Sequence, residues 1–210
     1  MGRGVHKSLR RQDITFEEKD QSLRDDVRTL GAMVGDLIRE QNGDELFELV
    51  EGARLRAIRR REGNEKPGEE LKALVKNLDP RTASQLIRGF STYFQMVNTA
   101  EKVHRIRRRR DYLRDVRIYQ PGGLEDSLIK LKASGMDIEG LQALLNSMSI
   151  EPVFTAHPTE ATRRTILRKE QNIVRHLVDL LNPSMTPQET AAALQNIRML
   201  ATTGWQTAEH

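Results

Sequence analysis

The chain has 210 residues, of which 37% are hydrophobic and 30% charged, with a formal net charge of +4. This composition is too apolar for a disordered chain, and the length allows one large domain or two small ones. The absence of cysteine excludes disulfide bonds, thiolate zinc sites and a cysteine nucleophile. Aromatic residues make up only 4%, so the core has to be built from aliphatic side chains, which favour helices.

Membrane and nucleic-acid roles find no support in the composition. No stretch approaches the roughly 18 consecutive apolar residues that a membrane-spanning helix needs. Met1 to Leu9 lack the apolar run of a signal peptide. We therefore expect a cytoplasmic protein without membrane contact. The excess of 34 basic over 30 acidic residues is too small to indicate a nucleic-acid partner.

The first part of the chain is predicted to be helical after an arm. Residues 1–20 are polar and basic without periodicity, and we expect a flexible arm. Apolar residues then recur at steps of three and four, which predicts helices over 22–42 and 44–61 with a glycine between them. Glycine and proline at 63–68 predict a mobile break, and a short helix is expected over 69–78.

A long helix is predicted next. Asp79 can cap its N-terminus, Pro80 suits its first turn, and the helical pattern continues to about Asp115. Its apolar positions are expected to be buried, namely Leu86, Ile87, Phe90, Tyr93, Phe94, Val97, Val103 and Ile106. Two shorter helices should follow near 124–134 and 137–148, which completes a helical region over 21–148.

The pattern changes at residues 150–156, which are short, apolar and rich in β-branched side chains. They predict one buried strand near 151–156. Helical periodicity resumes after Pro158 to Leu181, and a last helix runs from about Pro187 to the end. The fold class is therefore mainly α. Because one strand cannot form a sheet alone, we interpret the chain as a piece of a larger protein.

The run TAHPTE at residues 155–160 is the candidate active site. The predicted strand would present His157 at its C-terminal tip, where Pro158 keeps the backbone extended and Thr159 can cap the next helix. Parallel α/β proteins build their sites at such strand ends. A histidine there can act as a general acid or base near neutral pH, and the alternative is a structural histidine with satisfied hydrogen bonds.

Arg163 and Arg164 follow in the next helical turn. Cations near a helix N-terminus oppose the helix dipole, so their position makes more sense if an anion such as phosphate or carboxylate binds there. The alternative is an ion pair between Glu160 and Arg164 at four-residue spacing, worth roughly a few tenths of a kcal/mol.

These residues resemble a known family. The run VFTAHPTE at 153–160, continued by Arg163, Arg164 and Thr165, resembles the first active-site signature of phosphoenolpyruvate carboxylases. The resemblance extends to residues 30–43, 90–107 and 205–209, although Ala208 departs from the acidic residue common there. It covers nearly the whole chain from about Leu23.

The resemblance implies an enzyme that forms oxaloacetate and phosphate from phosphoenolpyruvate and bicarbonate with Mg²⁺ or Mn²⁺. Bicarbonate attacks the phosphoryl group, and the resulting carboxyphosphate releases CO₂ to the enolate of pyruvate. His157 would be the catalytic histidine of the carboxylation half. Arg163 and Arg164 would bind an anion, at a sugar-phosphate activator site near a subunit interface in preference to direct catalysis. Anionic allosteric effectors and a homotetramer are also implied.

The implied fold is the helical N-terminal region of an elaborated (β/α) barrel, with residues 149–210 starting the barrel and its first strand near 151–156. Family members are several times longer. Their metal-binding carboxylates, a Gly-rich segment with Arg and Asp, and a mobile glycine loop are not found in this sequence. We therefore assign no metal ligand here, expect further chain after His210, and expect this piece to be inactive alone.

Three other features of the sequence also allow a functional interpretation. The basic run 107–110 would spread around a helix, which favours a solvated or intersubunit face over nucleic acid. Glu101 and His104 have the spacing of a di-metal motif without its second copy, so His104 is expected to pack between helices or contact a carboxylate. Trp205 is expected in the core or an interface. The alternative function is a stand-alone helical interaction or anion-sensing protein that retains the signature as a relic.

Overall fold

The structure is a computed structural model that describes residues 18–62, 66–115, 119–153 and 163–207. Within those residues the fold is mainly α, as predicted. The elements are η1 (Glu18–Asp20), α1 (Gln21–Asn42), α2 (Asp44–Arg61), α3 (Lys66–Lys76), α4 (Pro80–Arg114), α5 (Leu124–Ala133), α6 (Ile138–Ser147), α7 (Arg164–Asp179) and α8 (Pro187–Trp205).

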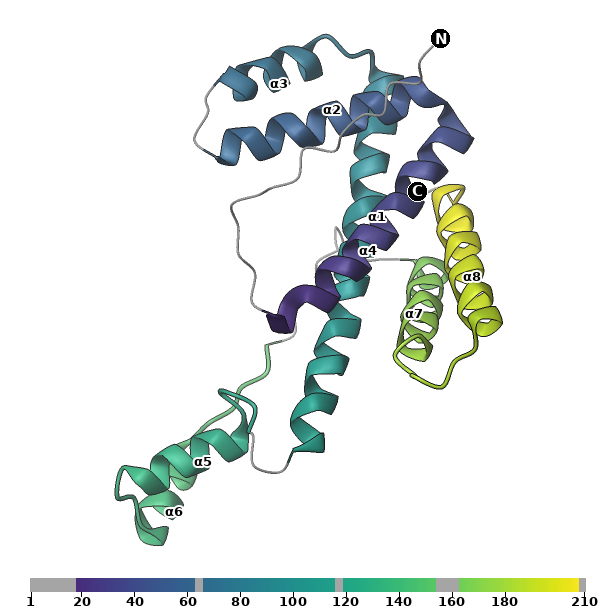
Figure 1. Cartoon of the computed structure of the whole chain (residues 1–210). Coiled ribbons are helices and arrows are strands. Elements are labelled where there is room, and N and C mark those ends of the chain that lie inside the picture. Colours follow the sequence, from purple (N-terminus) through teal and green to yellow (C-terminus); the bar gives the residue numbers. More distant parts are fainter. Residues whose placement is uncertain (1–17, 63–65, 116–118, 154–162, 208–210) are drawn as a thin grey trace.

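Helix α4 is a long central helix (Figure 1). Its first turn forms as predicted, because the Asp79 carboxylate accepts hydrogen bonds from the backbone N–H groups of Arg81 and Thr82 at 3.0 and 3.1 Å. Helices α1, α2, α7 and α8 all pack against it. One long helix therefore joins the N-terminal helices to the C-terminal pair.

The turn between α1 and α2 depends on one glycine. Gly43 adopts φ +86°, a left-handed conformation that costs a glycine little, and its N–H donates to the Arg39 carbonyl at 2.9 Å. The chain then enters α2 at once. The predicted bounds of 44–61 for this second helix are confirmed.

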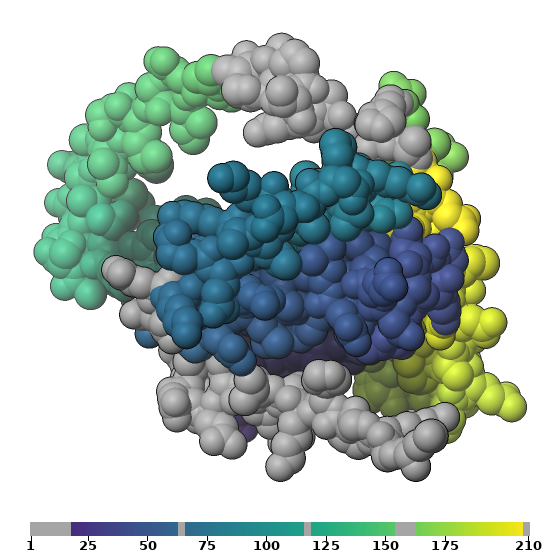
Figure 2. All heavy atoms as spheres, turned by 90° about the horizontal axis from the view of Figure 1, so that it is seen from above, coloured from purple at the N-terminus to yellow at the C-terminus, as the bar shows by residue number. Residues whose placement is uncertain are grey.

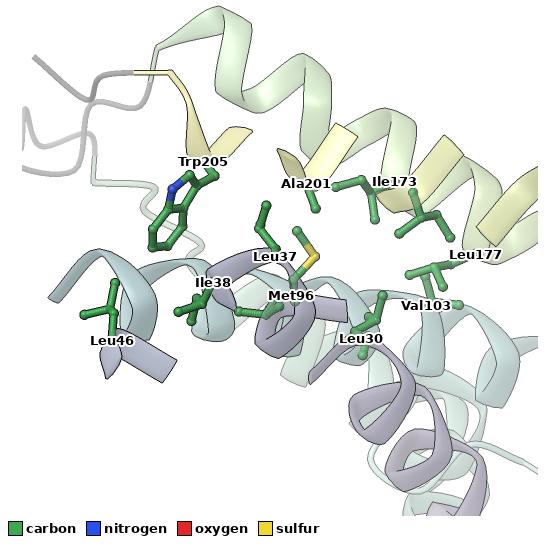
Figure 3. Packing of buried hydrophobic residues seen from close by; sticks show 13 residues of the cluster. Leu30, Leu37, Ile38, Leu46, Met96, Val103, Ile173, Leu177, Ala201 and Trp205 are labelled. Atoms are coloured by element: carbon green, nitrogen blue, oxygen red, sulfur yellow. The ribbon is translucent and has the colours of Figure 1, made fainter. Parts of the chain in front are cut away.

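The core lies where α1, α4, α7 and α8 meet (Figure 3). Its largest fully buried side chains come from α1, α4 and α8. Members drawn in the figure are Leu30, Leu37, Ile38, Leu46, Met96, Val103, Ile173, Leu177, Ala201 and Trp205. Each fully buried Leu, Ile, Val or Met contributes about 1.5–3 kcal/mol through burial, so this cluster dominates the stability of the packed helices.

Helices α5 and α6 form a separate hairpin beyond the C-terminal end of α4 (Figure 1). In the space-filling view they lie on one side of α1–α4, and α7 and α8 lie on the other (Figure 2). No residue of α5 or α6, both of which are described in full, is buried. Gly135, at φ +87°, provides the turn between them.

The burial predicted for the long helix was right for one face and wrong for the other. Leu86 and Val103 are buried, whereas Ile87 is 65% and Phe94 56% exposed. A 35-residue helix carries apolar side chains around much of its circumference, and the described helices cover only one side of α4. Phe94 instead packs against Tyr93, with ring centroids 5.7 Å apart.

The break predicted at Pro67 and Gly68 was also wrong. Both residues are buried in the first turn of α3, where a proline fits because no N–H is needed. Gly68 lies against the side chain of Arg60, and a Cβ there would come within 3.1 Å of its Cδ. Residues 63–65 lie outside the described residues.

The strand predicted near 151–156 is absent where the structure describes it. Glu151 to Val153 have no regular secondary structure, Val153 is 82% exposed, and 154–156 lie outside the described residues. A strand needs a neighbour for its backbone hydrogen bonds, and the described part of the chain offers none.

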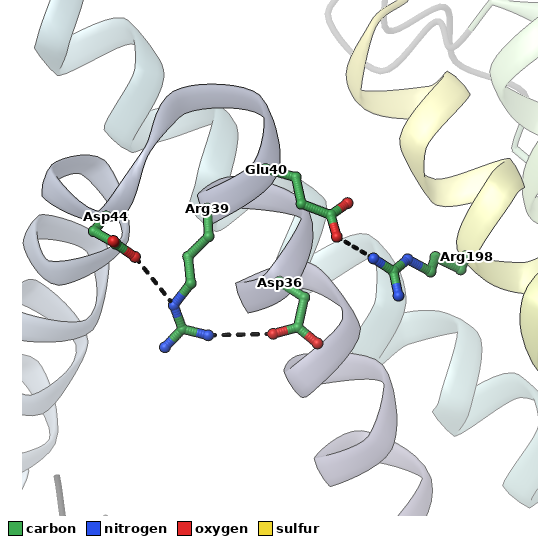
Figure 4. Close-up of polar contacts among 5 residues, drawn as sticks. All are labelled: Asp36, Arg39, Glu40, Asp44 and Arg198. Atoms are coloured by element: carbon green, nitrogen blue, oxygen red, sulfur yellow. Dashed lines mark hydrogen bonds and ion pairs between the residues drawn. The ribbon is translucent and has the colours of Figure 1, made fainter. Parts of the chain in front are cut away.

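Surface ion pairs add little to this packing. Arg39 contacts Asp36 at 3.2 Å and Asp44 at 3.7 Å, and Arg198 of α8 contacts Glu40 of α1 (Figure 4). All five side chains are at least 44% exposed, so each pair is worth at most about 1 kcal/mol.

Among the described helices, none combines the length and apolar character needed to cross a membrane.

Candidate functional site

The candidate site is the signature segment and the start of α7 that follows it. His157 lies outside the described residues, as do the other residues of 154–162. Its predicted role is therefore not tested by the structure. The description of the chain resumes at Arg163, so the part of the candidate site that the structure shows is the N-terminal end of α7.

Arg163 and Arg164 lie at the N-terminal end of α7, and both are exposed. Arg163 has φ −57° and ψ 140°, and its carbonyl accepts the N–H groups of Ile166 and Leu167 at 3.0 and 3.1 Å. The helix thus starts at Arg164 as a consequence of backbone geometry. Glu160, proposed above as an ion-pair partner of Arg164, lies outside the described residues.

The electrostatics of this helix end favour negative charge. Its first turn, which the structure describes completely, contains no acidic residue. Helices α1 and α4 share this feature, whereas α2, α3, α5, α6 and α8 each carry an acidic residue in the first turn. The N–H groups and the dipole of α7 would therefore meet an anion together with two guanidinium groups.

Apolar packing fixes the orientation of α7. Ile166, Ile173 and Leu177 are buried against α4 and α8. A small cavity of about 30 Å³ remains between the three helices, lined among others by Ile166, Gly204 and Trp205. The first turn of α7 therefore lies next to the last turn of α8, because the two helices run antiparallel.

Two lysines add polar contacts on either side of α7. Lys169 Nζ donates to the carbonyl of Thr203 at 2.7 Å and to Oγ1 of Thr207 at 2.5 Å, both at the C-terminal end of α8. On the other side, Lys102 Nζ of α4 lies 3.6 Å from Glu170 Oε2. Lys169 was not among the predicted site residues, because its partners are 34 and 38 residues away in the sequence and no local pattern links them.

His104 packs between helices and contacts a carboxylate, as predicted. It is 8% exposed, and its Nε2 lies 3.5 Å from Asp20 Oδ1. Arg107 Nη1 is 3.2 Å from His104 Nδ1, and Arg107 Nη2 donates to Asp26 Oδ2 at 2.8 Å. This network joins α4 to η1 and α1, and it gives His104 a structural role.

The basic run on α4 spreads around the helix, as predicted. Arg107 points inward to Asp26, and Arg108 donates to the Tyr112 hydroxyl at 2.9 Å. Arg109 and Arg110 are exposed. The four guanidinium groups therefore do not line one common face.

The described residues contain no group of three or more His, Asp or Glu side chains that could hold a metal ion.

Trp205, expected in the core or an interface, is 5% exposed and packs in the core, with the Arg88 guanidinium 5.6 Å from its ring centroid.

Known proteins match this chain over the helices and the signature segment described above. The sequence model of the family described as phosphoenolpyruvate carboxylase matches residues 23–210. A phosphoenolpyruvate carboxylase from Xanthomonas campestris pv. campestris (strain 8004) is 50% identical over 200 residues, which are 95% of this chain and 22% of the relative.

More distant relatives agree. A phosphoenolpyruvate carboxylase from Nitrosomonas eutropha is 39% identical over 194 residues, and one from Azorhizobium caulinodans is 38% identical over 199 residues. These alignments cover 92% and 94% of this chain and 21% of each relative. The chain thus spans about a fifth of the length of the curated relatives it matches. The resemblance first noticed at the signature is confirmed over almost every described helix, and the chain belongs to the phosphoenolpyruvate carboxylase family.

Proposed function

We propose that the chain is the N-terminal portion of an enzyme that forms oxaloacetate and phosphate from phosphoenolpyruvate and bicarbonate. The observation that carries the proposal is the signature VFTAHPTE at 153–160 with Arg163 and Arg164, within a family match that covers residues 23–210. The remaining parts of the reaction would be supplied by segments that correspond to the other four-fifths of the relatives.

In the proposed reaction, a bicarbonate oxygen attacks the phosphorus of phosphoenolpyruvate. The bond from phosphorus to the enol oxygen breaks, which gives carboxyphosphate and the enolate of pyruvate. Loss of CO₂ from carboxyphosphate leaves phosphate, and the enolate carbon captures the CO₂. His157 would take the acidic proton of carboxyphosphate, a task suited to a base that titrates near neutrality.

The Arg163–Arg164 pair would bind an anion at the start of α7. Support comes from the exposure of both residues and from a first turn without acidic side chains. We propose an activator phosphate as the guest in preference to the substrate, as the family resemblance implies.

The described residues do not fit a metal site, since no three His, Asp or Glu side chains among them cluster. As the family resemblance implies, we propose that the ligands of Mg²⁺ or Mn²⁺ belong to segments that correspond to the rest of the relatives. We further propose that the complete enzyme is a cytoplasmic homotetramer under allosteric control.

A chimeric enzyme tests the function. The segment of the Xanthomonas campestris relative that aligns with this chain is replaced by residues of this chain, and oxaloacetate is measured through malate dehydrogenase and NADH oxidation. We expect bicarbonate-dependent oxaloacetate formation, with the unmodified relative as reference. A chimera that assembles like the relative but forms no oxaloacetate would contradict the proposal and favour a helical interaction or anion-sensing protein.

A further inference from the structure

His104 is a buried titratable group that the proposed reaction does not use. Both nitrogens of its ring have a charged neighbour: Arg107 Nη1 lies 3.2 Å from Nδ1, and Asp20 Oδ1 lies 3.5 Å from Nε2. A guanidinium group can only donate hydrogen bonds, and an ionised carboxylate can only accept them. The ring therefore lies between a permanent donor on one side and an acceptor on the other.

The guanidinium group of Arg107 decides which ring nitrogen carries the proton. It can form a hydrogen bond with Nδ1 only where Nδ1 has a free lone pair, so the neutral ring carries its proton on Nε2, on the side of Asp20. Arg107 also donates from Nη2 to Asp26 Oδ2 at 2.8 Å. His104 and Asp26 together therefore fix the plane of this guanidinium group, which ties α4 to α1.

A second proton on the ring changes both contacts. It binds to Nδ1, where it would meet an N–H of Arg107, so two donors and two positive charges would face each other across 3.2 Å. The contact with Arg107 therefore has to break, while the attraction to Asp20 becomes stronger. Histidine is the side chain that takes up such a proton between about pH 5 and 8.

Three neighbouring elements bring acidic groups to this part of α4. Helix η1 brings Asp20 to the ring, and α1 brings Asp26 to the guanidinium group beside it. Helix α7 brings Glu170, which lies 3.6 Å from Lys102 of α4. Because Lys102 precedes His104 by two residues, it points about 200° away from the ring around the helix. The carboxylate of α7 therefore belongs to another side of α4.

The charged residues one turn before and after His104 on α4 have partners of their own. Glu101 lies 3.9 Å from Arg105, and Arg108 donates to the Tyr112 hydroxyl at 2.9 Å. Neither of these pairs involves the imidazole ring. The response of the ring to protonation is therefore argued from its two direct neighbours.

We propose that His104 is a pH-sensitive switch that exchanges the contacts of α4. The neutral ring holds Arg107 on Asp26 and so ties α4 to α1, whereas the protonated ring releases Arg107 and pairs with Asp20 of η1. Acidification thereby moves the attachment of α4 from α1 to the short helix before it. The switch is independent of the reaction proposed above, because these four residues lie outside the signature.

The first test determines the protonation of the ring nitrogens in the ¹⁵N-labelled 210-residue chain. Long-range ¹H–¹⁵N NMR spectra at pH 8 should show His104 only in the form with the proton on Nε2. His176, whose Nδ1 lies 3.9 Å from a carboxylate oxygen of Asp179 in place of a guanidinium group, is the internal reference. A neutral His104 ring that carries its proton on Nδ1, or that exchanges between both forms, would overturn the proposal.

The second test follows Arg107 from pH 8 to pH 5. Protection of its guanidinium protons, corrected for intrinsic exchange, should fall about tenfold as the His104 ring protonates, because a hydrogen bond of a charged group is lost. In His104→Gln the amide oxygen can accept from Arg107 and does not titrate, so protection should stay constant to within about twofold.

Constant protection in the parent chain, or an equal fall in His104→Gln, would overturn the switch. If His104→Gln does not fold, the parent decides the question alone, because the loss of protection has to follow the signal of the His104 ring. A loss that does not follow this signal would also count against the proposal.

The third test addresses the partner of the protonated ring. At pH 5 the Nε2–H proton of His104 should exchange about fivefold faster in Asp20→Ala than in the parent, because its charged acceptor is removed. Glu18→Ala, an exposed change on the same short helix, is the matched control and should leave this exchange unchanged. Equal exchange in Asp20→Ala and the parent, or an equal rise in Glu18→Ala, would exclude Asp20 as the partner and overturn the proposal.

Discussion

Two helical hairpins of this chain have opposite surroundings. In the pair α7–α8, residues such as Ile173, Leu177 and Ile197 are buried against α1 and α4. In the pair α5–α6 no described residue is buried, and Leu124 and Ile138 are 76% and 84% exposed. Both pairs consist of two consecutive helices, joined by residues 134–137 in α5–α6 and by residues 180–186 in α7–α8.

The difference shows that an apolar pattern makes a helix amphipathic without deciding whether its apolar face is covered. Coverage depends on a surface supplied by another element, and α4 supplies one to α7 and α8 but not to α5 and α6. The same distinction applies to polar side chains, since an arginine paired with a carboxylate and exposed arginines occur within one run on α4. Matched substitutions, one at a residue with a packing partner and one at an exposed residue, can therefore measure how much stability the partner contributes.

The largest effect is expected from removing a buried side chain of α8. Ile197 is fully buried, and Ile197→Ala should lower the free energy of unfolding by about 2–5 kcal/mol through lost burial and a residual cavity. The matched change Ile138→Ala in α6 should alter it by no more than about 0.5 kcal/mol. Urea denaturation followed by circular dichroism measures both. Equal losses would break the comparison between the hairpins.

A smaller effect is expected within the basic run. Arg107→Ala removes the donor to Asp26 and the neighbour of His104, and it should lower the free energy of unfolding by about 1–3 kcal/mol, because partly buried acceptors lose their partner. Arg109→Ala on the exposed side should change it by less than about 0.5 kcal/mol. Thermal unfolding of the two variants side by side decides this, and identical transitions would refute the network.

The smallest effect concerns a half-exposed pair on α2. The Arg54 guanidinium, which donates to both carboxylate oxygens of Glu51 at 2.8 and 2.6 Å, lowers the pKa of Glu51. A carboxylate with a lowered pKa in the folded state adds stability above the unfolded value of about 4.3 and loses it as the pH falls through the folded value.

Glu51→Gln should therefore be less stable than the parent by about 0.5 kcal/mol at neutral pH, with solvent screening keeping the value small. The gap should close as the pH falls below about 4. Glu48→Gln, an exposed change on the same helix, is the control. Denaturant titrations across this range measure the difference, and a gap that widens in acid would show that the sign is wrong.

Local chemistry made much of the fold predictable from the sequence. Asp79 and Pro80 predicted the start of α4, and Gly43 predicted the end of α1, because capping and left-handed turns depend on a few adjacent residues. The family was also recognisable from adjacent residues of the signature. In each of these cases the informative residues are neighbours along the chain.

Other features depend on partners distant in the sequence and were out of reach. The exposure of Ile87 and Phe94 follows from which face of α4 another helix covers. The contacts of Lys169 join helices that are more than thirty residues apart. The arrangement around His157 depends on residues outside the described part of the chain, so its role stays a prediction.

The most direct test of the central claim compares two products in the chimeric enzyme. His157→Asn should abolish oxaloacetate formation, because the carboxylation half of the reaction loses its base. Part of the bicarbonate-dependent phosphate release should persist, because the first phosphoryl transfer does not need that base. His176→Asn, a matched change at a partly exposed histidine of α7, should keep both products. Unchanged oxaloacetate formation in His157→Asn would contradict the account.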